Sequence, residues 1–379
     1  MRITIVIAGL GGGGAERVCV NLANAWVERR HHVTILTVNQ NSAPAYAIDP
    51  RVERADIGWP RWATNEELNS AAIAPIIRGL HDAGCAKQLM EQITILALLR
   101  HAILARKPDV VISHIDVTNV LVLAALAAAN VPVIVCEHTD NTRISLGSWQ
   151  NVRAALYRRA RAVVASHPNS AAWLEGHGAR AYTIPNPLIT PPPRSHDRNG
   201  SRLRLVTLTR LSEEKRPGWF VHAFASIAKN FPEWDFDVYG DGPLHSSIAN
   251  LVGSVAPKRI QLRGFTDAPY DVLNEADLFV STSWVEGFGN SIWESLACGV
   301  PVVAMDAGAP VRSLVRDGVD GLIVNENYVD ALASALASLM GDNERRKAFA
   351  VRAPEVLTRF PLEAALHSWD QLLAEVTGG

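Results

Sequence analysis

The sequence has 379 residues, enough for two domains that each bury a core of their own. Hydrophobic residues make up 48% of it and charged residues 20%, which excludes a long disordered chain. The net charge is −2, so overall charge gives no reason to expect nucleic-acid binding. Residues 1–190 carry 18 Lys and Arg against 14 Asp and Glu, whereas residues 191–379 carry 18 against 24. The basic first half fits an anionic membrane surface or acceptor, and a chance asymmetry equally well.

The four cysteines are far apart and form neither a CxxC pair nor a metal-binding spacing, so we predict no disulfide framework and a reducing, cytoplasmic location. The first apolar run meets glycines too soon for a signal peptide. The stretch Val117–Cys136 is about long enough to span a bilayer, but polar residues and Pro132 interrupt it. We predict a buried helix over 119–129, then a strand, and no transmembrane helix.

Short apolar segments alternate with helical patterns through the first half of the chain. The predicted strands are Ile3–Ala8, Val33–Val38, Asp109–Ser113, Pro132–Cys136 and Ala162–Ala165. A helix is predicted over Glu16–Arg29, where apolar residues recur at helical spacing. This alternation predicts a parallel sheet covered on both faces, a doubly wound α/β domain. Residues 40–90 interrupt this alternation and predict an insertion, with a helix near Ala86–Arg106. The insertion fits either an acceptor-binding region or a variable surface segment.

A segment rich in proline and polar residues predicts a linker, with the domain boundary near 187–202. After it the alternation restarts. The predicted strands are Leu203–Thr207, Asp235–Tyr239, Ile260–Arg263, Leu278–Thr282, Pro301–Ala304 and Gly321–Val324. The predicted helices are Pro217–Asn230, His245–Val255, Ile292–Cys298, Ala309–Val315 and Asn327–Met340. We therefore expect domains over 1–188 and 189–361, a cleft between their strand ends, and a last helix within 362–379.

A glycine-rich loop, Gly11-Gly-Gly-Gly-Ala-Glu-Arg17, separates the first strand from the first helix. Glycine lets the backbone approach a phosphate, and the following helix offers N–H groups and a positive dipole end. The loop lacks the G-x-G-x-x-G spacing of dinucleotide sites, and the second strand ends in Thr37-Val-Asn-Gln40, without a ribose-binding acid. An oxidoreductase is therefore disfavoured. A tight strand–helix turn would select glycine as well.

Two cations, Arg210 and Lys215, flank the loop after the first strand of the second half. At a strand end they can neutralise a diphosphate leaving group. Glu213 and Glu214 lie between them, which fits a solvated loop equally well.

Two glutamates, Glu286 and Glu294, lie close together in sequence after the strand Leu278–Thr282. The glycines between them can expose backbone N–H groups, and the helix that starts at Asn290-Ser291 can bind phosphate at its first turn. We expect Glu294 to accept hydrogen bonds from a ribose and Glu286 from a sugar. A pair of general acid–base carboxylates is the competing interpretation. It is disfavoured because both acids lie beside a phosphate-type loop.

These motifs occur in one order and spacing with Tyr239-Gly-Asp-Gly-Pro243, Arg263-Gly-Phe265 and Ala297–Val303. Together they resemble glycosyltransferase family 4, whose members have two Rossmann-like domains in the GT-B fold. The resemblance covers nearly the whole chain and is strongest with bacterial enzymes that build capsule, exopolysaccharide, lipopolysaccharide or lipid-linked oligosaccharide. One departure is Thr209, where the family usually has Gly before the Arg.

The resemblance implies a nucleotide-sugar site with a role for each matching position. The donor phosphates would be contacted by Gly13 and Gly14 and held by Arg210 and Lys215. The ribose would be bound by Glu294, the base would lie by Arg263 and Phe265, and the transferred sugar would be contacted by Glu286 with Gly287, Phe288, Gly289, Asn290 and Ser291. His138 would orient the donor, or stabilise developing positive charge through its backbone carbonyl. By itself, a histidine after a strand is more often structural.

Family membership further implies retention of the anomeric configuration, with front-face attack by the acceptor hydroxyl and a leaving phosphate that takes the proton. No metal or separate cofactor is expected. Asp235-Phe-Asp237 spells a D-x-D, which we interpret as structural or solvent-facing. The donor sugar would be carried by UDP, by family frequency alone, and the acceptor would be a glycan or lipid-linked glycan. The last helix would cross back to the N-terminal domain.

Peripheral contact with the inner membrane is a further expectation. Arg153, Arg158, Arg159 and Arg161 lie on or near one predicted helix that ends the first domain, and fit an anionic lipid surface or a solvated face equally. Two other functions stay open. One is a sugar-nucleotide epimerase of the same architecture, which would not be expected to show the two-glutamate motif. The other is a non-catalytic partner subunit, disfavoured by intact Arg210, Lys215 and both glutamates.

Overall fold

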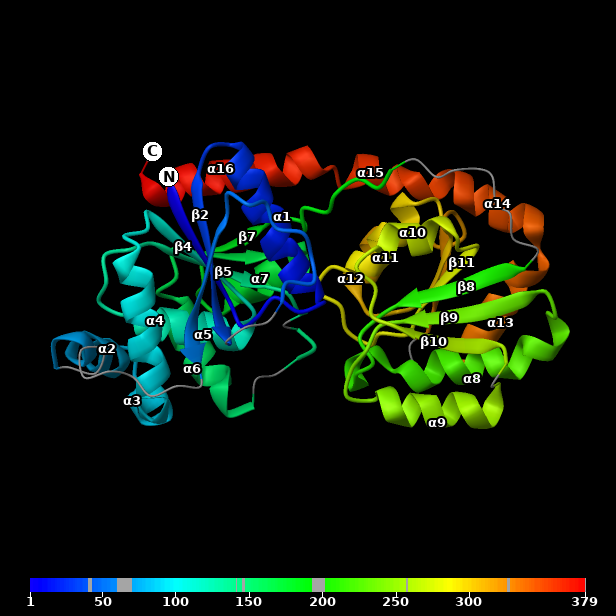
Figure 1. Cartoon of the computed structure of the whole chain (residues 1–379), viewed down its shortest axis with the longest axis horizontal. Helices are drawn as coiled ribbons and strands as arrows, with labels where there is room; N and C mark the ends of the chain where they lie inside the picture. The colour runs from blue at the N-terminus through cyan, green and yellow to red at the C-terminus, as the bar shows by residue number, and fades with distance from the viewer. Residues whose placement is uncertain are drawn as a thin grey trace. The chain divides into compact units, whose positions relative to one another are not determined.

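The computed structural model (Figure 1) describes residues 1–39, 43–59, 70–140, 142–144, 147–192, 202–256, 258–325 and 328–378. The chain divides into two compact units. Unit 1 comprises Met1–Pro187 and Glu363–Gly379, and unit 2 comprises Leu188–Leu362. The predicted boundary after residue 188 falls one residue beyond this division. The last helix belongs to unit 1.

Within the described residues, unit 1 contains a parallel sheet of seven strands. In order across the sheet they are β3 (Glu53–Trp59), β2 (His32–Asn39), β1 (Arg2–Ile7), β4 (Val110–His114), β5 (Val133–Glu137), β6 (Ala162–Ala165) and β7 (Ala181–Thr183). The chain builds outward from β1 in one direction and from β4 in the other, so the order reverses between these two strands. In such sheets, ligands bind beyond the carboxyl ends of the strands at the reversal.

The helices of unit 1 cover both faces of this sheet. They are α1 (Gly14–Glu28), α2 (Ser70–Asp82), α3 (Ala86–Leu89), α4 (Ile93–Ala105), α5 (Asp116–Ala125), α6 (Gln150–Tyr157), α7 (Pro168–Gly176) and α16 (Leu362–Thr377), with 3-10 turns η1 (Met90–Gln92) and η2 (Gly147–Trp149). All five residues of β4 and of β5 are buried, as expected for strands covered on both sides. Helix α1 buries Val18, Leu22 and Trp26, which recur along one stripe.

The last helix, α16, packs on α1 within unit 1 (Figure 1). The Trp369 ring meets Trp26 edge-on, with ring centroids 5.6 Å apart and an interplanar angle of 82°. Arg29 Nε lies 3.2 Å from Asp370 Oδ2. These contacts bind the C-terminal segment to the first unit through both apolar packing and charge.

Unit 2 repeats the architecture with a parallel sheet of six strands in the described residues. In order they are β10 (Ile260–Gly264), β9 (Trp234–Tyr239), β8 (Leu203–Leu208), β11 (Leu278–Ser281), β12 (Val302–Met305) and β13 (Gly321–Val324). Its helices are α8 (Pro217–Ile227), α9 (His245–Val255), α10 (Pro269–Asn274), α11 (Asn290–Ala297), α12 (Ala309–Leu314), α13 (Val329–Gly341), α14 (Asn343–Arg352) and α15 (Val356–Arg359), with turns η3 (Glu213–Lys215), η4 (Ala228–Asn230) and η5 (Ala353–Glu355). The order reverses between β8 and β11.

The prediction of two doubly wound α/β domains is confirmed. Two strands, β3 and β7, were missed. Both lie at an edge of the first sheet, and their sequences, ERADIGW and AYT, lack the continuous apolar run of a central strand. Helix α2 was also missed, and it contains Pro75 in its interior.

Several predicted boundaries were wrong. The helix predicted over Ala86–Arg106 is divided into α3, η1 and α4, and the helix predicted over 119–129 starts earlier, at Asp116. Residues 193–201 of the predicted linker and residue 327, the predicted start of a helix, lie outside the described residues. Residues 60–69 of the predicted insertion lie outside them as well.

Candidate functional site

The ends of β8 and β11 meet at the reversal of the second sheet, and the loops after them are tied together. Thr282 Oγ1 donates to the carbonyl oxygens of Lys215 and Arg216, at 2.7 Å and 3.1 Å. The Trp284 N–H donates to the Glu214 carbonyl, 3.1 Å away. The loop that carries Arg210 and Lys215 is therefore held against the loop that leads to the two glutamates, although Glu286 lies 71 positions after Lys215 in sequence.

Lys215 and Glu286 form an ion pair in this arrangement. The Lys215 Nζ lies 2.6 Å from Glu286 Oε1, and the side chains are 21% and 14% exposed. Arg210, after β8, is exposed. The geometry brings together a cation and an acid that sequence reasoning had assigned to diphosphate and to sugar. A ligand with a diphosphate and sugar hydroxyls can take over both halves of this pair.

The segment between the two glutamates turns sharply into α11. Gly289 is the N-cap and has a φ of 98°, a conformation that residues with side chains rarely adopt. Its neighbour Phe288 is buried and meets Phe360 edge-on, with ring centroids 5.6 Å apart. Because this aromatic side chain is anchored in the core, it fixes the backbone of the turn from Gly287 to Asn290. Ser291 occupies the first turn of α11.

Glu294 lies in the second turn of α11 and is only 3% exposed. A carboxylate at this depth requires polar partners, because burying a charge without them is very costly. Ligand hydroxyls are one source of such partners. The structure thus separates the two glutamates by environment, with Glu286 paired to a lysine and Glu294 within the core of the unit.

The base-side residues predicted from the sequence have different environments. Arg263 Nε donates to Asp237 Oδ1 at 2.8 Å, and the Asp237 side chain is 4% exposed. Phe265 is 48% exposed, an unusual position for a large aromatic ring. Asp235 forms ion pairs with Arg202 and Arg259. Both aspartates of the D-x-D therefore pair with arginines, and the solvent-facing alternative is wrong for Asp237.

Gly240 explains why the Tyr239–Pro243 segment needs glycine. A Cβ atom at Gly240 would lie 1.8 Å from the carbonyl oxygen of Thr209, and its φ is +127°. The Thr209 N–H donates to the Tyr239 carbonyl at 2.9 Å, and the Leu211 N–H donates to the Asp241 carbonyl at 2.9 Å. The segment therefore lies directly against the backbone that leads into Arg210. Thr209, the departure from the family pattern, is accommodated within this contact.

In unit 1, the glycine-rich loop leads from β1 into α1. Gly13 is the N-cap of α1, Gly14 is its first residue, and Gly14 is exposed. A Cβ atom at Gly13 would lie 2.1 Å from Glu16 Oε2, so this carboxylate lies over the first turn. Negative charge is favoured there by the helix dipole. A ligand phosphate at this turn would have to displace Glu16.

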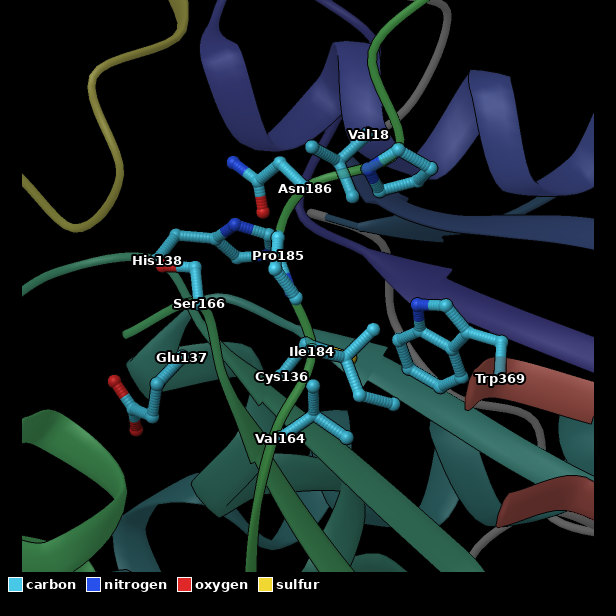
Figure 2. A pocket seen from close by; sticks show the side chains of 11 residues that line it. Val18, Cys136, Glu137, His138, Val164, Ser166, Ile184, Pro185, Asn186 and Trp369 are labelled. Atoms are coloured by element: carbon cyan, nitrogen blue, oxygen red, sulfur yellow. The ribbon is translucent and has the colours of Figure 1, made fainter. Parts of the chain in front are cut away.

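His138 follows β5 and contacts a second histidine, His114, the last residue of β4. His114 Nδ1 and His138 Nε2 lie 2.8 Å apart. His138 also lines a small pocket of unit 1 (Figure 2), in which the Glu137 side chain points away from that of His138. His114 was not among the site residues predicted from the sequence. The β-strand order, which places the two strand ends side by side, is what reveals the pair.

The four arginines near the end of the first domain do not all lie on the surface. Arg153 is only 2% exposed, with its guanidinium 5.2 Å from the Trp173 ring centroid. Arg158 and Arg159 donate to backbone carbonyls, of His177 at 3.2 Å and of Gly79 at 3.1 Å. Arg158, Arg159 and Arg161 are nevertheless exposed, so contact with an anionic membrane stays a prediction for these three.

All four cysteines are buried thiols. No three His, Cys, Asp or Glu side chains within the described ranges are grouped so as to hold a metal ion. In the same part of the chain, no helix combines the length and the apolar character that crossing a bilayer requires.

Comparisons with known proteins agree with this architecture. The family profile described as Glycosyltransferase Family 4 matches residues 12–190, and that of Glycosyl transferases group 1 matches residues 202–342. An N-acetylgalactosaminyltransferase of Campylobacter jejuni is 26% identical over 99% of both chains. The poly(glycerol-phosphate) alpha-glucosyltransferase of Bacillus subtilis is 31% identical over 44% of this chain, a match that spans 25% of that protein.

Solved structures share the fold at low sequence identity. A mutant of TarM from S. aureus, in complex with UDP and sugar ligands, has a TM-score of 0.79 and 13% identity, covering 98% of this chain and 100% of that one. HepE from Anabaena, in complex with UDP and glucose, has a TM-score of 0.77 and 18% identity over 99% of each chain. With both family profiles matched in chain order and two Rossmann-like units of the GT-B type, this chain belongs to the family 4 glycosyltransferases and is an enzyme of that class.

Proposed function

We propose that this glycosyltransferase moves a hexose-type sugar from a UDP-sugar, with retention of configuration, to a glycan or lipid-linked glycan acceptor in bacterial surface polysaccharide or glycoconjugate synthesis. The observation that carries the proposal is the Lys215–Glu286 ion pair at the strand reversal of unit 2. The Campylobacter relative acts, by its name, on an undecaprenol-diphosphate-linked glycan, and TarM and HepE were crystallised with UDP. These relatives support the choice of donor and acceptor.

The donor diphosphate would engage Arg210 and Lys215. An anion with two phosphates attracts both cations, and Lys215 can exchange its carboxylate partner for it without losing a charge-assisted hydrogen bond. Glu286, released from Lys215, would then accept hydrogen bonds from sugar hydroxyls, with the Gly287–Ser291 backbone beside it. Glu294 would bind the ribose, and Arg263 with Phe265 would lie by the base.

Catalysis would rest on stabilising charge on the leaving group. As the bond from the sugar to the diphosphate breaks, negative charge develops on the phosphate, and fixed cations at that position lower the barrier. The acceptor hydroxyl would attack from the same face and pass its proton to the departing phosphate. Gly13 and Gly14 would contact a donor phosphate, and His138 would orient the sugar or stabilise its positive charge. No protein nucleophile and no metal take part in this proposal.

The test compares charge-removing variants with a matched surface pair. Arg210→Met should lower kcat for transfer or donor hydrolysis by about 100- to 1,000-fold, the loss typical when one charge-stabilising group is removed. Glu286→Gln should also lower kcat, because the carboxylate that accepts hydrogen bonds from the sugar hydroxyls is lost. The control is Lys347→Met, since Lys347 and Glu344 form an exposed pair 3.3 Å apart on α14. The control variant should keep full activity. Wild-type rates in both site variants would rule out the proposed site.

The stereochemistry and the reaction type have separate readouts. NMR of the first-formed product should show the anomeric configuration of the donor, and an inverted product would refute the retaining mechanism. Incubation of the enzyme with donor alone should release nucleotide diphosphate and sugar. An epimerised nucleotide-sugar product would instead favour the alternative of an epimerase.

A further inference from the structure

The strand order of unit 1 brings two histidines together at the carboxyl ends of β4 and β5. His114 stands opposite Cys136 in the parallel register, and His138 lies two residues beyond Cys136. Because side chains two residues apart along an extended chain point to the same side, both imidazoles can meet on one face. Their rings lie nearly parallel, with an interplanar angle of 22° and centroids 5.1 Å apart.

The depth of the two rings differs. His114 is fully buried, on a strand whose other residues are mostly apolar, whereas His138 is half-buried and lines the pocket of Figure 2. Burying an imidazole is costly unless its nitrogens are hydrogen-bonded. His114 Nδ1 meets His138 Nε2 at 2.8 Å, and His114 Nε2 has no hydrogen-bond partner in the described part of the chain. Contact with His138 is therefore the polar interaction that accounts for a histidine at this position.

The protonation state of the pair follows from this asymmetry. Burial lowers the pKa of His114 well below its usual range and lowers the pKa of His138 to about 4. Both rings are neutral at neutral pH, so one of the two facing nitrogens donates and the other accepts. If His138 donated, His114 would carry its proton on Nε2, and an N–H would be buried without an acceptor. Orphaned buried donors are rarer than orphaned acceptors, so His114 Nδ1–H is the donor.

The backbone next to the histidine pair is strained at Ile115, and hydrogen bonds hold it in place. Ile115, directly after His114, has a φ of 74° and a ψ of 133°, a region that β-branched residues normally avoid. Its N–H donates to the Cys136 carbonyl at 3.3 Å, and Asn119 Nδ2 donates to the same carbonyl at 3.0 Å. These bonds join the end of β4 directly to the residues that precede His138.

A second group of contacts supports the β5 side. Tyr157 donates its hydroxyl proton to Glu137, the residue before His138, and receives a hydrogen bond from Asn119 at 3.1 Å. All three side chains are buried. A strained backbone such as that at Ile115 persists only where the surrounding structure enforces it, and such strain concentrates at functional sites. The chain thus fixes the positions of both histidines from both strands.

We propose that His114 is a positioning residue, which fixes the ring plane of His138 and, by donating to its Nε2, holds the His138 proton on Nδ1. The proposal rests on the proposed function, in which His138 acts on the donor sugar. With its Nε2 occupied, His138 offers an Nδ1–H, a hydrogen-bond donor suited to a sugar or phosphate oxygen. The partner that orients a functional histidine commonly controls which nitrogen is available.

The test combines two substitutions with a direct measurement of the tautomer. His114→Phe keeps a flat ring against His138 and removes the donor, whereas His114→Asn keeps a donor near the place of Nδ1. We expect His114→Phe to lower kcat by about 10- to 100-fold, the range seen when partners that orient metal-bound histidines are removed, with KM nearly unchanged. His114→Asn should recover most of the activity. His177→Phe is the matched control, since His177 also stacks on an aromatic ring, with its centroid 3.8 Å from that of Trp173, and should keep full activity.

Nitrogen-15 NMR of histidine-labelled protein, assigned by comparison with His138→Ala, reports the tautomer. In the wild type, Nδ1 of His138 should be protonated and Nε2 unprotonated. In His114→Phe the population protonated on Nε2 should increase. A wild-type His138 protonated on Nε2 would overturn the inference. A kcat loss in His114→Phe without a change of tautomer, or without recovery in His114→Asn, would overturn it as well. Full activity in His138→Ala would refute the proposed role of His138 in the reaction, while the tautomer would still decide whether His114 positions it.

Discussion

Substitutions at Lys215 and Glu286 should show that the ion pair contributes to the stability of unit 2 separately from its contribution to activity. In Lys215→Met the aliphatic stem is kept and the ammonium is lost. The Glu286 carboxylate, whose side chain is only 14% exposed, then loses a partner 2.6 Å away. The second substitution, Glu286→Gln, removes the carboxylate that had been left behind. The double variant therefore has neither charge nor an unpaired ion.

The expected loss of stability follows from the partial burial of the Lys215–Glu286 pair. Exposed ion pairs contribute about 0.2–1 kcal/mol, and breaking a fully buried pair costs about 3–5 kcal/mol. With side chains 21% and 14% exposed, the pair lies between these limits. We expect Lys215→Met to lower the free energy of unfolding by about 2 kcal/mol, a decrease of roughly 4–8 °C in Tm for a domain of this size. The double variant should regain most of that loss and remain inactive.

Scanning calorimetry of the wild type, both single variants and the double variant gives the coupling energy of the pair. The same cycle on Lys347 and Glu344, whose side chains are 66% and 84% exposed, is the control and should give about 0.3–0.5 kcal/mol. Equal coupling in the two cycles would refute the argument that partial burial makes the Lys215–Glu286 pair stronger than an exposed pair. An active double variant would refute the proposal that these charges serve the reaction.

Three further results are expected. Gly240→Ala should destabilise unit 2 by at least about 2 kcal/mol in calorimetry, because its Cβ would lie 1.8 Å from the Thr209 carbonyl oxygen at a φ of +127°. Gly253→Ala, in α9 with open space around its Cβ, should instead stabilise it by about 0.5–1 kcal/mol, and a loss there would contradict the comparison. Hydrogen bonds, mainly from Arg352, lower the pKa of Glu355 from 4.5 to about 2, so its stabilisation is complete above pH 4.5 and lost as the pH falls through 2. The Tm difference between wild type and Glu355→Gln should shrink over that window, and a constant difference would refute this assignment. UDP at 100 times its Kd should stabilise the protein by about 2.7 kcal/mol, and GDP and ADP at the same concentration should stabilise it less. Equal increases in Tm with the three nucleotides would contradict the proposed preference for UDP.

The alternation of short apolar strands with helices was readable from the sequence because it is local. A buried parallel strand needs a continuous apolar run, and a helix on a sheet needs an apolar stripe, so β1, β4, β5 and α1 could all be predicted. The edge strands β3 and β7 could not, since one side of an edge strand meets no neighbouring strand and its sequence is under less constraint. The candidate loops were found for a related reason, because glycines, cations and acids stand directly after predicted strands.

The sequence alone therefore determined the two doubly wound domains and the strand ends that carry Arg210, Glu286 and His138. Only the tertiary structure decided which side chains meet there. The Lys215–Glu286 contact depends on β8 and β11 being neighbours, and the His114–His138 contact depends on the register of β4 and β5. Strand order and register are set by packing over the whole sheet, through contacts between residues far apart in the chain. No local pattern of residues contains that information.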